Sequence, residues 1–444
     1  MSKKIVVIGS NHAGTAAIRT ILSTDPGADV TVFDANSNIS FLGCGMALWI
    51  GKQIGGSEGL FYSNREQLEK MGAKIHMETE VNKIDFKARK IFAAKDGAEL
   101  IENYDKLILA TGSLPIVPDI PGKDLQNVQL VKLYQHAQEV IQKLDDKSIQ
   151  NVVVVGAGYI GVELAEAFQR TGRSVTVIDV GDTCIANYFD TPFTDSMNEV
   201  LRANGINLHY NERLLEIKGE GKVQSVKTDK GEYPADMVVL CIGFRPNNEL
   251  GKNQLELFRN GAYLVNKRQE TSVPDVYAIG DCATVYDNTI DSVNYIALAT
   301  NAVRSGLVAA FNICGADIES IGVQGSNGIC IYDYKMVSTG VTLAKAKALG
   351  IDAAYGEFED YQKPGFIETA NEKVKIRIVY DNASKRVLGA QIASKYDISM
   401  AIHMFSLAIQ EHVTIDRLKL LDIFFLPHFN QPYNYITMAA LSAK

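Results

Sequence analysis

The sequence predicts an α/β protein with two Rossmann-like dinucleotide-binding domains and a third, α+β domain at its C-terminal end. Three observations support this prediction. A strand, a glycine-rich turn, a helix and a second strand ending in an acid open the chain, and the pattern returns about 147 residues later. From about residue 319, strand-like runs and a helix follow without such a turn. The 444 residues also exceed what one hydrophobic core supports, since a domain typically takes ~150 residues.

The first unit begins with an apolar, β-branched run at residues 5–8, typical of a buried parallel strand. The turn after it reads Gly9-Ser10-Asn11-His12-Ala13-Gly14, with an asparagine where the dinucleotide fingerprint has its second glycine. A helix is expected over 15–23, and a strand over 30–33 ends in Asp34. The outer glycines allow a tight turn and close helix packing, and the helix N-terminus can receive a pyrophosphate. Asp34 can accept hydrogen bonds from ribose hydroxyls.

Short strands are expected next, at 74–77 and 90–93, and a longer one from about 104 ends in a small-residue turn at 110–112. Three prolines between 115 and 121 mark a boundary. Residues 123–146 are expected to be helical and polar.

The second unit repeats the first with the glycine fingerprint intact. An apolar strand at 152–155 leads into Gly156-Ala157-Gly158-Tyr159-Ile160-Gly161, followed by an expected helix over 162–171 and a strand over 174–178. That strand ends in Asp179. Because a carboxylate there repels a 2′-phosphate, the sequence predicts NADH rather than NADPH.

The rest of the chain adds a buried strand near 237–243, a strand feeding the Gly280-Asp281 turn, and a helix from about residue 301. In the third domain, strands are expected at 328–332, 337–340, 374–380 and 388–393, with a helix over 399–411.

Composition excludes several function classes. The net charge of −8 and the absence of a basic block argue against nucleic acid as a partner. No stretch reaches the ~18 apolar residues of a membrane helix, so a cytoplasmic protein without a membrane partner is expected. The six cysteines and seven histidines show no metal-ligand spacing, so no metal site is predicted.

Cys44 stands between Gly43 and Gly45, which removes side-chain bulk on both sides. The local sequence fits a reactive thiol and a buried structural thiol equally well.

Taken together, the motifs resemble the pyridine nucleotide-disulfide oxidoreductase family. They are G-S-N-H-A-G, S-F-L-G-C-G-M, A-T-G-S, G-A-G-Y-I-G, G-F-R-P-N, T-S-x-P-D-V-Y-A-I-G-D and L-A-T-N-A, and they span nearly the whole chain. The resemblance is to the single-cysteine branch of NADH oxidases, NADH peroxidases and coenzyme A-disulfide reductases. It implies FAD on a first, discontinuous domain, NADH on the second, and a C-terminal domain that pairs two subunits into a homodimer. The expected domains are 1–114 with 245–318 (FAD), 115–244 (NADH) and 319–444 (dimerisation).

The resemblance also implies which residues bind the cofactors. For FAD these are Gly9, Ser10, Asn11, His12, Ala13, Gly14, Asp34, Cys44, Val81, Ala110, Thr111, Gly112, Ser113, Lys132, Asp281, Leu298, Ala299, Thr300 and Phe425. For NADH they are Gly156, Gly158, Tyr159, Ile160, Gly161, Asp179, Tyr188, Gly243, Ala297 and Gly328. Tyr159 is expected over the flavin face where nicotinamide docks, and His428 in a segment that reaches the partner subunit's active site.

The wider family has a second cysteine five residues after the first, where this chain has Trp49. Cys44 is therefore expected to act alone, as thiolate and sulfenic acid or by capping with an external thiol. In the implied reaction, NADH reduces FAD, O2 forms a flavin hydroperoxide, and Cys44 takes the terminal oxygen, so that O2 ends as water. His12 is expected to exchange protons at the oxygen, and Cys44 to have a lowered pKa.

Alternatives remain within and outside the branch. A peroxidase would carry an arginine where this chain has Val303, and Arg304 is one helical step away, so an oxidase is favoured. A coenzyme A-disulfide reductase fits less well, because Met46 and Ala47 replace its expected residues. An electron-transfer reductase would lack the reactive cysteine, and a redox-sensing protein would keep the same residues.

Overall fold

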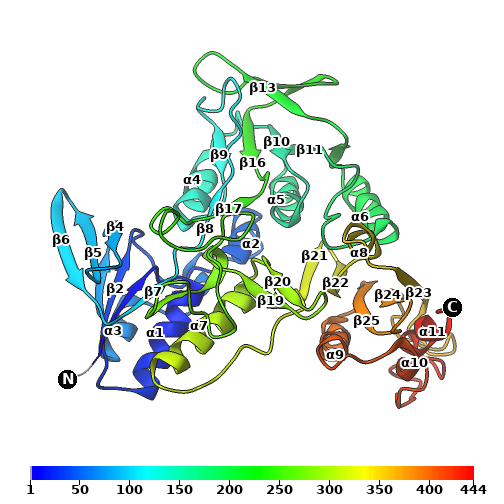
Figure 1. The fold of residues 1–444 in the computed structure, drawn as a ribbon. Helices are drawn as coiled ribbons and strands as arrows, with labels where there is room; N and C mark the ends of the chain where they lie inside the picture. Colours follow the sequence, from blue (N-terminus) through cyan, green and yellow to red (C-terminus); the bar gives the residue numbers. More distant parts are fainter. Residues whose placement is uncertain (1–2) are drawn as a thin grey trace.

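The computed structural model describes residues 3–444, and a five-stranded parallel sheet forms its first unit (Figure 1). In spatial order the strands are β18 (Val276–Ala278), β7 (Lys106–Leu109), β1 (Lys4–Ile8), β2 (Asp29–Asp34) and β3 (Lys74–Met77). Every pairing is parallel, and nearly all side chains of β1 and β2 are buried, which explains their apolar, β-branched sequences. Since β18 pairs with β7, the chain returns to this sheet after building the second unit.

Helices α1 (His12–Thr24) and α7 (Ala299–Ile313) pack against each other beside this sheet. Gly306 of α7 makes this possible, because a Cβ there would lie 2.5 Å from the backbone oxygen of Ala13. An antiparallel sheet of β4 (Glu80–Asp85), β5 (Lys90–Lys95) and β6 (Ala98–Asn103) adds to the first unit. Short helices α2 (Met46–Ile50) and α3 (Arg65–Lys70) follow β2.

The second unit repeats the architecture. Its parallel sheet runs β12 (Asn207–His209), β11 (Ser174–Ile178), β10 (Asn151–Val155), β16 (Met237–Leu240) and β9 (Val128–Leu130). Helices α4 (Tyr134–Leu144), α5 (Tyr159–Arg170) and α6 (Thr191–Ala203) flank it, and β13 (Leu214–Lys218), β14 (Ser225–Thr228) and β15 (Glu232–Pro234) form a separate antiparallel sheet (Figure 1).

A two-stranded antiparallel ribbon joins the two units. It consists of β8 (Ser113–Pro115), where the chain leaves the first unit, and β17 (Phe244–Pro246), where the chain comes back. A small hairpin, β19 (Val285–Asp287) with β20 (Ser292–Asn294), follows β18. The two connections between the units thus lie side by side, and their pairing restrains the orientation of one parallel sheet relative to the other.

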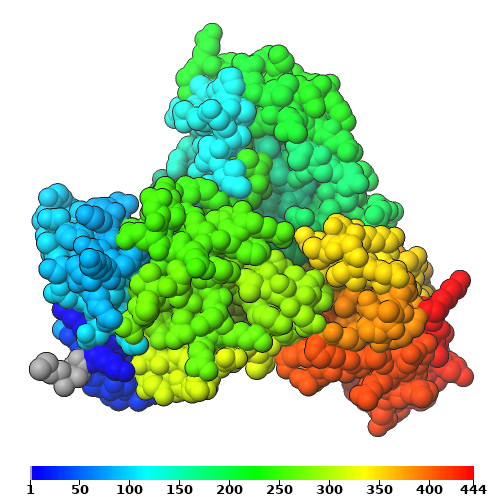
Figure 2. All heavy atoms as spheres, in the orientation of Figure 1, coloured from blue at the N-terminus to red at the C-terminus, as the bar shows by residue number. Residues whose placement is uncertain are grey.

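The C-terminal part is a separate lobe (Figure 2). Its antiparallel sheet runs β21 (Asn327–Ile331), β22 (Tyr334–Gly340), β25 (Val387–Ser394), β24 (Lys373–Asp381) and β23 (Ala353–Tyr361). The helices are α8 (Leu343–Ala348), α9 (Ser399–Gln410), α10 (Ile415–Leu418) and α11 (Tyr435–Leu441). No helix within residues 3–444 is both long and apolar enough to cross a membrane.

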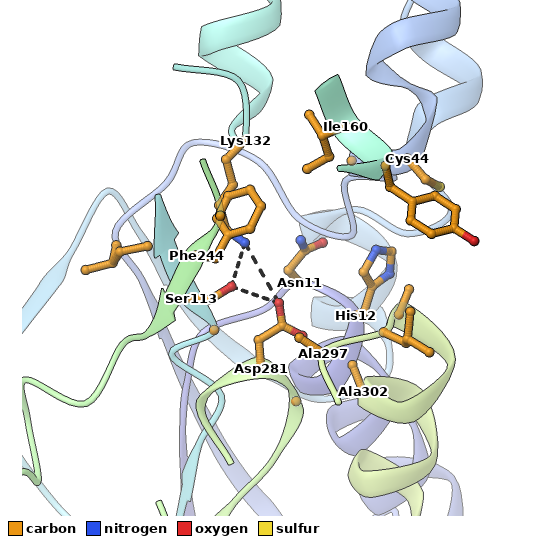
Figure 3. A pocket seen from close by; sticks show the side chains of 18 of the residues that line it. Asn11, His12, Cys44, Ser113, Lys132, Ile160, Phe244, Asp281, Ala297 and Ala302 are labelled. Atoms are coloured by element: carbon orange, nitrogen blue, oxygen red, sulfur yellow. Dashed lines mark hydrogen bonds and ion pairs between the residues drawn. The ribbon is translucent and has the colours of Figure 1, made fainter. Parts of the chain in front are cut away.

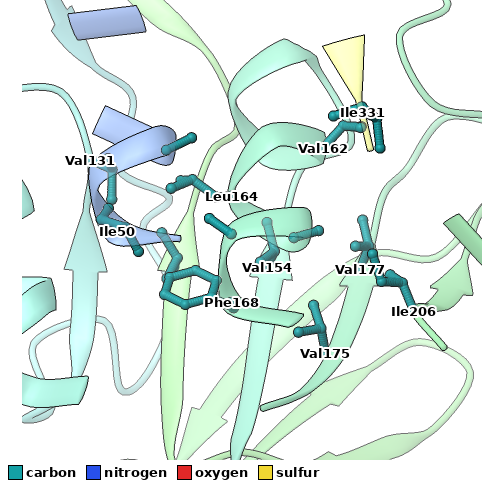
Figure 4. Packing of buried hydrophobic residues seen from close by; sticks show 14 of the residues in the cluster. Ile50, Val131, Val154, Val162, Leu164, Phe168, Val175, Val177, Ile206 and Ile331 are labelled. Carbon is teal, nitrogen blue, oxygen red and sulfur yellow. The ribbon is translucent and has the colours of Figure 1, made fainter. Parts of the chain in front are cut away.

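One buried hydrophobic cluster connects all three parts (Figure 4). Ile50 comes from α2 of the first unit, Phe168 from α5 of the second, and Ile331 from β21 of the C-terminal lobe. Each of the three is at most 1% exposed. This shared packing holds the parts together around the space between them.

Several helix boundaries differ from the sequence prediction. Helix α1 begins at His12 rather than residue 15, and α5 at Tyr159 rather than 162, so the last glycine of each fingerprint lies inside the first helical turn. A larger residue would clash at these positions, because a Cβ on Gly14 would lie 1.9 Å from the backbone oxygen of Gly9. The predicted helix over 123–146 is also partly wrong, since strand β9 lies within this stretch and the helix starts only at Tyr134.

Candidate active site

A cavity of about 1750 Å³ lies where the two parallel sheets and the C-terminal lobe meet. The carboxyl ends of β1 and β10 both open into it, which is where α/β sheets bind ligands. Both glycine-rich turns, the segment around Cys44 and the start of β21 line it. Figure 3 shows Asn11 and His12 of the first turn, Ile160 of the second turn, and Cys44.

The first glycine turn is shaped for an anionic ligand. Gly9 has φ +99°, and a Cβ there would lie 2.3 Å from the oxygen of Ala110. The backbone amide and the hydroxyl of Ser10 donate to one oxygen of Asp34 at 2.7 and 2.6 Å, so this buried carboxylate is fixed at the end of β2. No side chain caps the N-terminus of α1, which leaves its free amides for an anion, as a bound pyrophosphate requires.

The second turn repeats this construction. Gly156 has φ +105°, and a Cβ there would lie 2.4 Å from the oxygen of Cys241. Asp179 accepts hydrogen bonds from the amides of Ala157 and Gly181, the latter at 2.6 Å. Helix α5 also lacks a side-chain cap. Both turns therefore fit a dinucleotide, with an acid placed for the ribose.

A group of three polar residues lies deeper in the cavity (Figure 3). Lys132 donates to the Ser113 hydroxyl at 2.7 Å, Ser113 donates to Asp281 at 2.9 Å, and the ammonium lies 3.8 Å from that carboxylate. The Lys132 ammonium also lies 4.3 Å from the centre of the Phe244 ring. Burial lowers the pKa of Lys132, and the charge of Asp281 opposes this.

Cys44 lies in a short 3₁₀ turn (Gly43–Gly45) and is exposed toward the cavity. Gly45 packs closely on Leu60, since a Cβ there would lie 2.2 Å from a methyl carbon of that side chain, which would have to move. Trp49, which stands where the wider family has its second cysteine, stacks on Tyr134 with ring centres 5.5 Å apart. All six cysteines are free thiols in the described chain.

The expected lowering of the Cys44 pKa is wrong for this structure. Burial raises the pKa of the thiol, and the carboxylate of Glu163 raises it further, while nearby backbone amides oppose both effects. Glu163 lies on α5 and lines the cavity, and burial together with Glu166 raises its own pKa to about 7. Glu163 was not among the predicted site residues, although its position four residues after Tyr159 places it on the same helix face.

His12 lies on the same side of the cavity as Cys44 (Figure 3). Burial lowers its pKa, Asp281 opposes this and Lys132 adds to it, so the ring is neutral near pH 7. Val303 places no cation beside His12, but Lys132 acts as one. Arg304 instead donates to Asn301 at 2.9 Å and, in the described chain, does not line the cavity.

Tyr159 lines the cavity from the side of the second unit. Its ring meets that of Tyr188 edge to face, with centres 4.6 Å apart, and its hydroxyl donates to Asn327 of β21. Burial raises the pKa of Tyr159 well above its usual range, so the phenol stays protonated. Asn327 is a second residue that the sequence analysis missed.

Most residues expected at the site do line this one cavity. Three do not: Gly14, Gly161 and Phe425. The two glycines lie beneath the turns, where a Cβ would lie 1.9 and 1.8 Å from the backbone oxygens of Gly9 and Gly156. Phe425 is 46% exposed on the C-terminal lobe, and His428 is exposed beside it, so their own chain does not bring them to the cavity. Residues 3–444 contain no group of three or more side chains placed to hold a metal ion.

Known protein families and individual proteins match this chain over nearly its whole length. A family model described as "Pyridine nucleotide-disulphide oxidoreductase" matches residues 3–306, and its "dimerisation domain" matches residues 327–434. The NADH oxidase of Streptococcus pyogenes serotype M6 is 61% identical, with 99% of each chain covered. The NADH oxidase of Lactococcus lactis subsp. cremoris is 51% identical, covering 99% of this chain and 100% of the relative.

Among solved structures, the water-forming NADH oxidase from Lactobacillus brevis bound to NADH superposes with a TM-score of 0.96. It is 40% identical and covers 99% of this chain and 98% of its own. The family and the fold class predicted from the motifs are both confirmed. The chain belongs to the pyridine nucleotide-disulphide oxidoreductase family.

Proposed function

We propose that this chain is an FAD-dependent NADH oxidase that reduces O2 to water, with Cys44 as its redox-active residue. The observation that carries the proposal is the cavity itself. Cys44 is the exposed cysteine that faces it together with His12, between two glycine turns that each fit a dinucleotide; Cys241, the other cysteine in the lining, is half-buried, and both are free thiols in the described chain. The high identity to proteins named NADH oxidase supports the same activity.

FAD and NADH are the cofactors, and each of the two glycine turns would bind one of them. FAD, when bound, accepts a hydride from NADH and passes the electrons to oxygen. The first turn and Asp34 would hold the adenine end of FAD, and Lys132, Ser113 and Asp281 would hold its more central polar groups. The second turn would hold NADH, with the Asp179 carboxylate against the ribose and Tyr159 at the nicotinamide end.

Cys44 and His12 complete the reduction. Once the first NADH has reduced O2 to the level of peroxide, the Cys44 thiolate attacks one oxygen and the O–O bond breaks. The other oxygen leaves with the bonding electrons, takes a proton from His12 and becomes water. Two electrons from a second NADH then break the S–O bond of the sulfenic acid, which releases a second water and restores the thiolate. The balance is two NADH and two protons consumed for each O2.

The C-terminal lobe carries the family's dimerisation domain, and its surface fits a homodimer. Large apolar side chains are exposed together near its end; they include Leu420 (89%), Phe424 (66%), Phe429 (56%) and Tyr433 (75%). Burial of this surface by a second copy is favourable, and Phe425 and His428 would then approach the partner's cavity.

Simultaneous recording of NADH and O2 consumption by the purified holoenzyme, with a peroxide assay, tests the proposal. Water formation requires two NADH per O2 and no free peroxide, because four electrons reduce O2 fully. One NADH per O2 with stoichiometric peroxide contradicts it. Turnover that needs added peroxide, or coenzyme A disulfide, instead of O2 identifies one of the related activities.

A further inference from the structure

We propose that Tyr62 is a positioning residue that fixes the tautomer of His12, so that the ring proton sits on Nε2 and faces the cavity. The inference rests on the proposed role of His12 as proton donor. The Tyr62 hydroxyl lies 3.0 Å from His12 Nδ1, and the two rings are parallel within 3°, with centres 5.7 Å apart. In residues 3–444, Nε2 has no hydrogen-bond partner.

The direction of this hydrogen bond follows from the chemistry of the two groups. A phenol is a better donor than a neutral imidazole N–H, and a ring nitrogen is a better acceptor than a phenol oxygen. Burial raises the pKa of Tyr62 to about 12, so the hydroxyl keeps its proton. Nδ1 is its only hydrogen-bond partner in the described chain. Tyr62 therefore donates to Nδ1, and the single proton of the neutral ring is left on Nε2.

Tyr62 acts through His12 rather than on a ligand, because it does not line the main cavity in the described chain. It lines a smaller pocket of about 480 Å³, together with Arg19 and Lys70. Tyr62 therefore contacts His12 from outside the cavity and can orient its ring without touching a ligand in the cavity.

The segment that carries Tyr62 is also fastened to the segment that carries Cys44. The Ser40 hydroxyl donates to the oxygen of Ser63 and accepts from its amide, both at 2.7 Å. The amide of Leu42 donates to the oxygen of Leu60 at 2.8 Å. Since these contacts flank Tyr62 and precede Cys44 directly, the thiol and the tyrosine are fixed relative to each other. Tyr62, which contacts His12, therefore lies on a segment that is hydrogen-bonded to the segment of Cys44, and this fixes the position of His12 relative to the sulfur.

The consequence concerns proton delivery. As the Cys44 sulfur attacks a peroxide oxygen, the second oxygen leaves with the electron pair and needs a proton. The tautomer with Nε2–H has that proton on the cavity side, whereas the other tautomer would point it at Tyr62. Nε2 then recovers a proton from a solvent water, and the hydroxide equivalent passes to the solvent, so the ring returns to its neutral tautomer.

Nitrogen-15 NMR of the holoenzyme, labelled only at histidine, reads the tautomer directly. His12→Asn identifies the His12 signals among the seven histidines. The wild type is expected to show Nδ1 unprotonated and Nε2 protonated near pH 7.5, and Tyr62→Phe to show a mixture. Nδ1 protonated in the wild type, or an unchanged pattern in Tyr62→Phe, overturns the proposal. Tyr332→Phe is the matched control, since it removes a hydroxyl that donates to Gln169 at 2.9 Å outside the cavity.

A second readout uses hydrogen peroxide as the probe, without NADH or O2. Trapping of the Cys44 sulfenic acid gives the rate of oxidation, which should fall about three- to tenfold in Tyr62→Phe, as expected for one lost hydrogen bond. KM for NADH should not change, because Tyr62 is not in the second turn. An unchanged oxidation rate, or a loss confined to KM, contradicts the role. The tautomer and the rate of oxidation by hydrogen peroxide do not depend on O2 reduction, so failure of the oxidase assignment would leave these two readouts interpretable.

Discussion

Lys132 and Asp281 lie 3.8 Å apart, and the Ser113 hydroxyl connects them by accepting from the lysine and donating to the carboxylate. These residues come from three segments that are distant in sequence and meet in one cavity. The arrangement places a positive charge beside polar atoms where FAD would lie, and the pKa of His12 responds to both charges.

Replacement of Lys132 by methionine keeps the length of the side chain and removes its charge. We expect FAD to bind about tenfold more weakly, since hydrogen bonds to charged groups contribute roughly 1.5–3 kcal/mol. FAD retention after dialysis, measured by absorbance, gives the result. Lys227→Met, at an exposed lysine of the second unit, is the control, and equal FAD retention in both variants would refute the role of Lys132.

Asp179→Ala should relax the preference for NADH. The carboxylate repels a 2′-phosphate, so its removal should lower the ratio of kcat/KM for NADH over NADPH by about tenfold or more. Asp182→Ala, nearby but outside the cavity lining in the described chain, should leave the ratio as it is. Discrimination that survives in Asp179→Ala would show that another group recognises the ribose.

Glu163→Gln should make Cys44 more reactive, with a characteristic pH dependence. Removal of the carboxylate charge favours the thiolate and lowers the pKa of the thiol, so alkylation by iodoacetamide should be about threefold faster at pH 8.5. Because the pKa of Glu163 is about 7, the wild-type carboxyl is largely protonated near pH 6, and the two proteins should then react alike. Equal rates at both pH values would mean that Glu163 does not act on the thiol.

Gly14→Ala should destabilise the first unit although alanine favours helices. The new Cβ would lie 1.9 Å from the oxygen of Gly9, and the backbone there has no room to move without disturbing β1. We expect a loss of about 2–3 kcal/mol in the free energy of unfolding. Gly27→Ala meets only a side-chain oxygen at 3.5 Å and is the control. Thermal unfolding of the two variants at equal midpoints would contradict the packing argument.

The sequence predicted those parts of the site that are local. Asp34 and Asp179 follow strands in a repeated pattern, and the lone Cys44 lies between glycines, so spacing and composition sufficed to find them. The helix starts were placed late for a physical reason. Glycine usually marks a helix boundary, whereas the close approach of Gly14 to Gly9 requires that glycine inside the first helical turn.

What the sequence could not predict arises from contacts between distant segments. Tyr62 lies 50 residues after His12 and contacts it in the fold, where Ser40 and Ser63 join the Tyr62 segment to the Cys44 segment. The direction of the Cys44 pKa shift depends on Glu163, which belongs to the other dinucleotide unit. Such effects depend on how the units face each other, which periodicity and motifs do not encode.

The central claim is that Cys44 converts oxygen at the peroxide level to water. Cys44→Ser keeps the size of the side chain and the binding sites for both cofactors but removes the sulfur, and Cys330→Ser, at an exposed cysteine outside the cavity lining in the described chain, is its control. The most direct measurement is the hydrogen peroxide released per NADH oxidised by these variants in air. The account predicts about one peroxide per NADH for Cys44→Ser and almost none for the control and the wild type. A Cys44→Ser enzyme that still oxidises NADH and forms only water would contradict it.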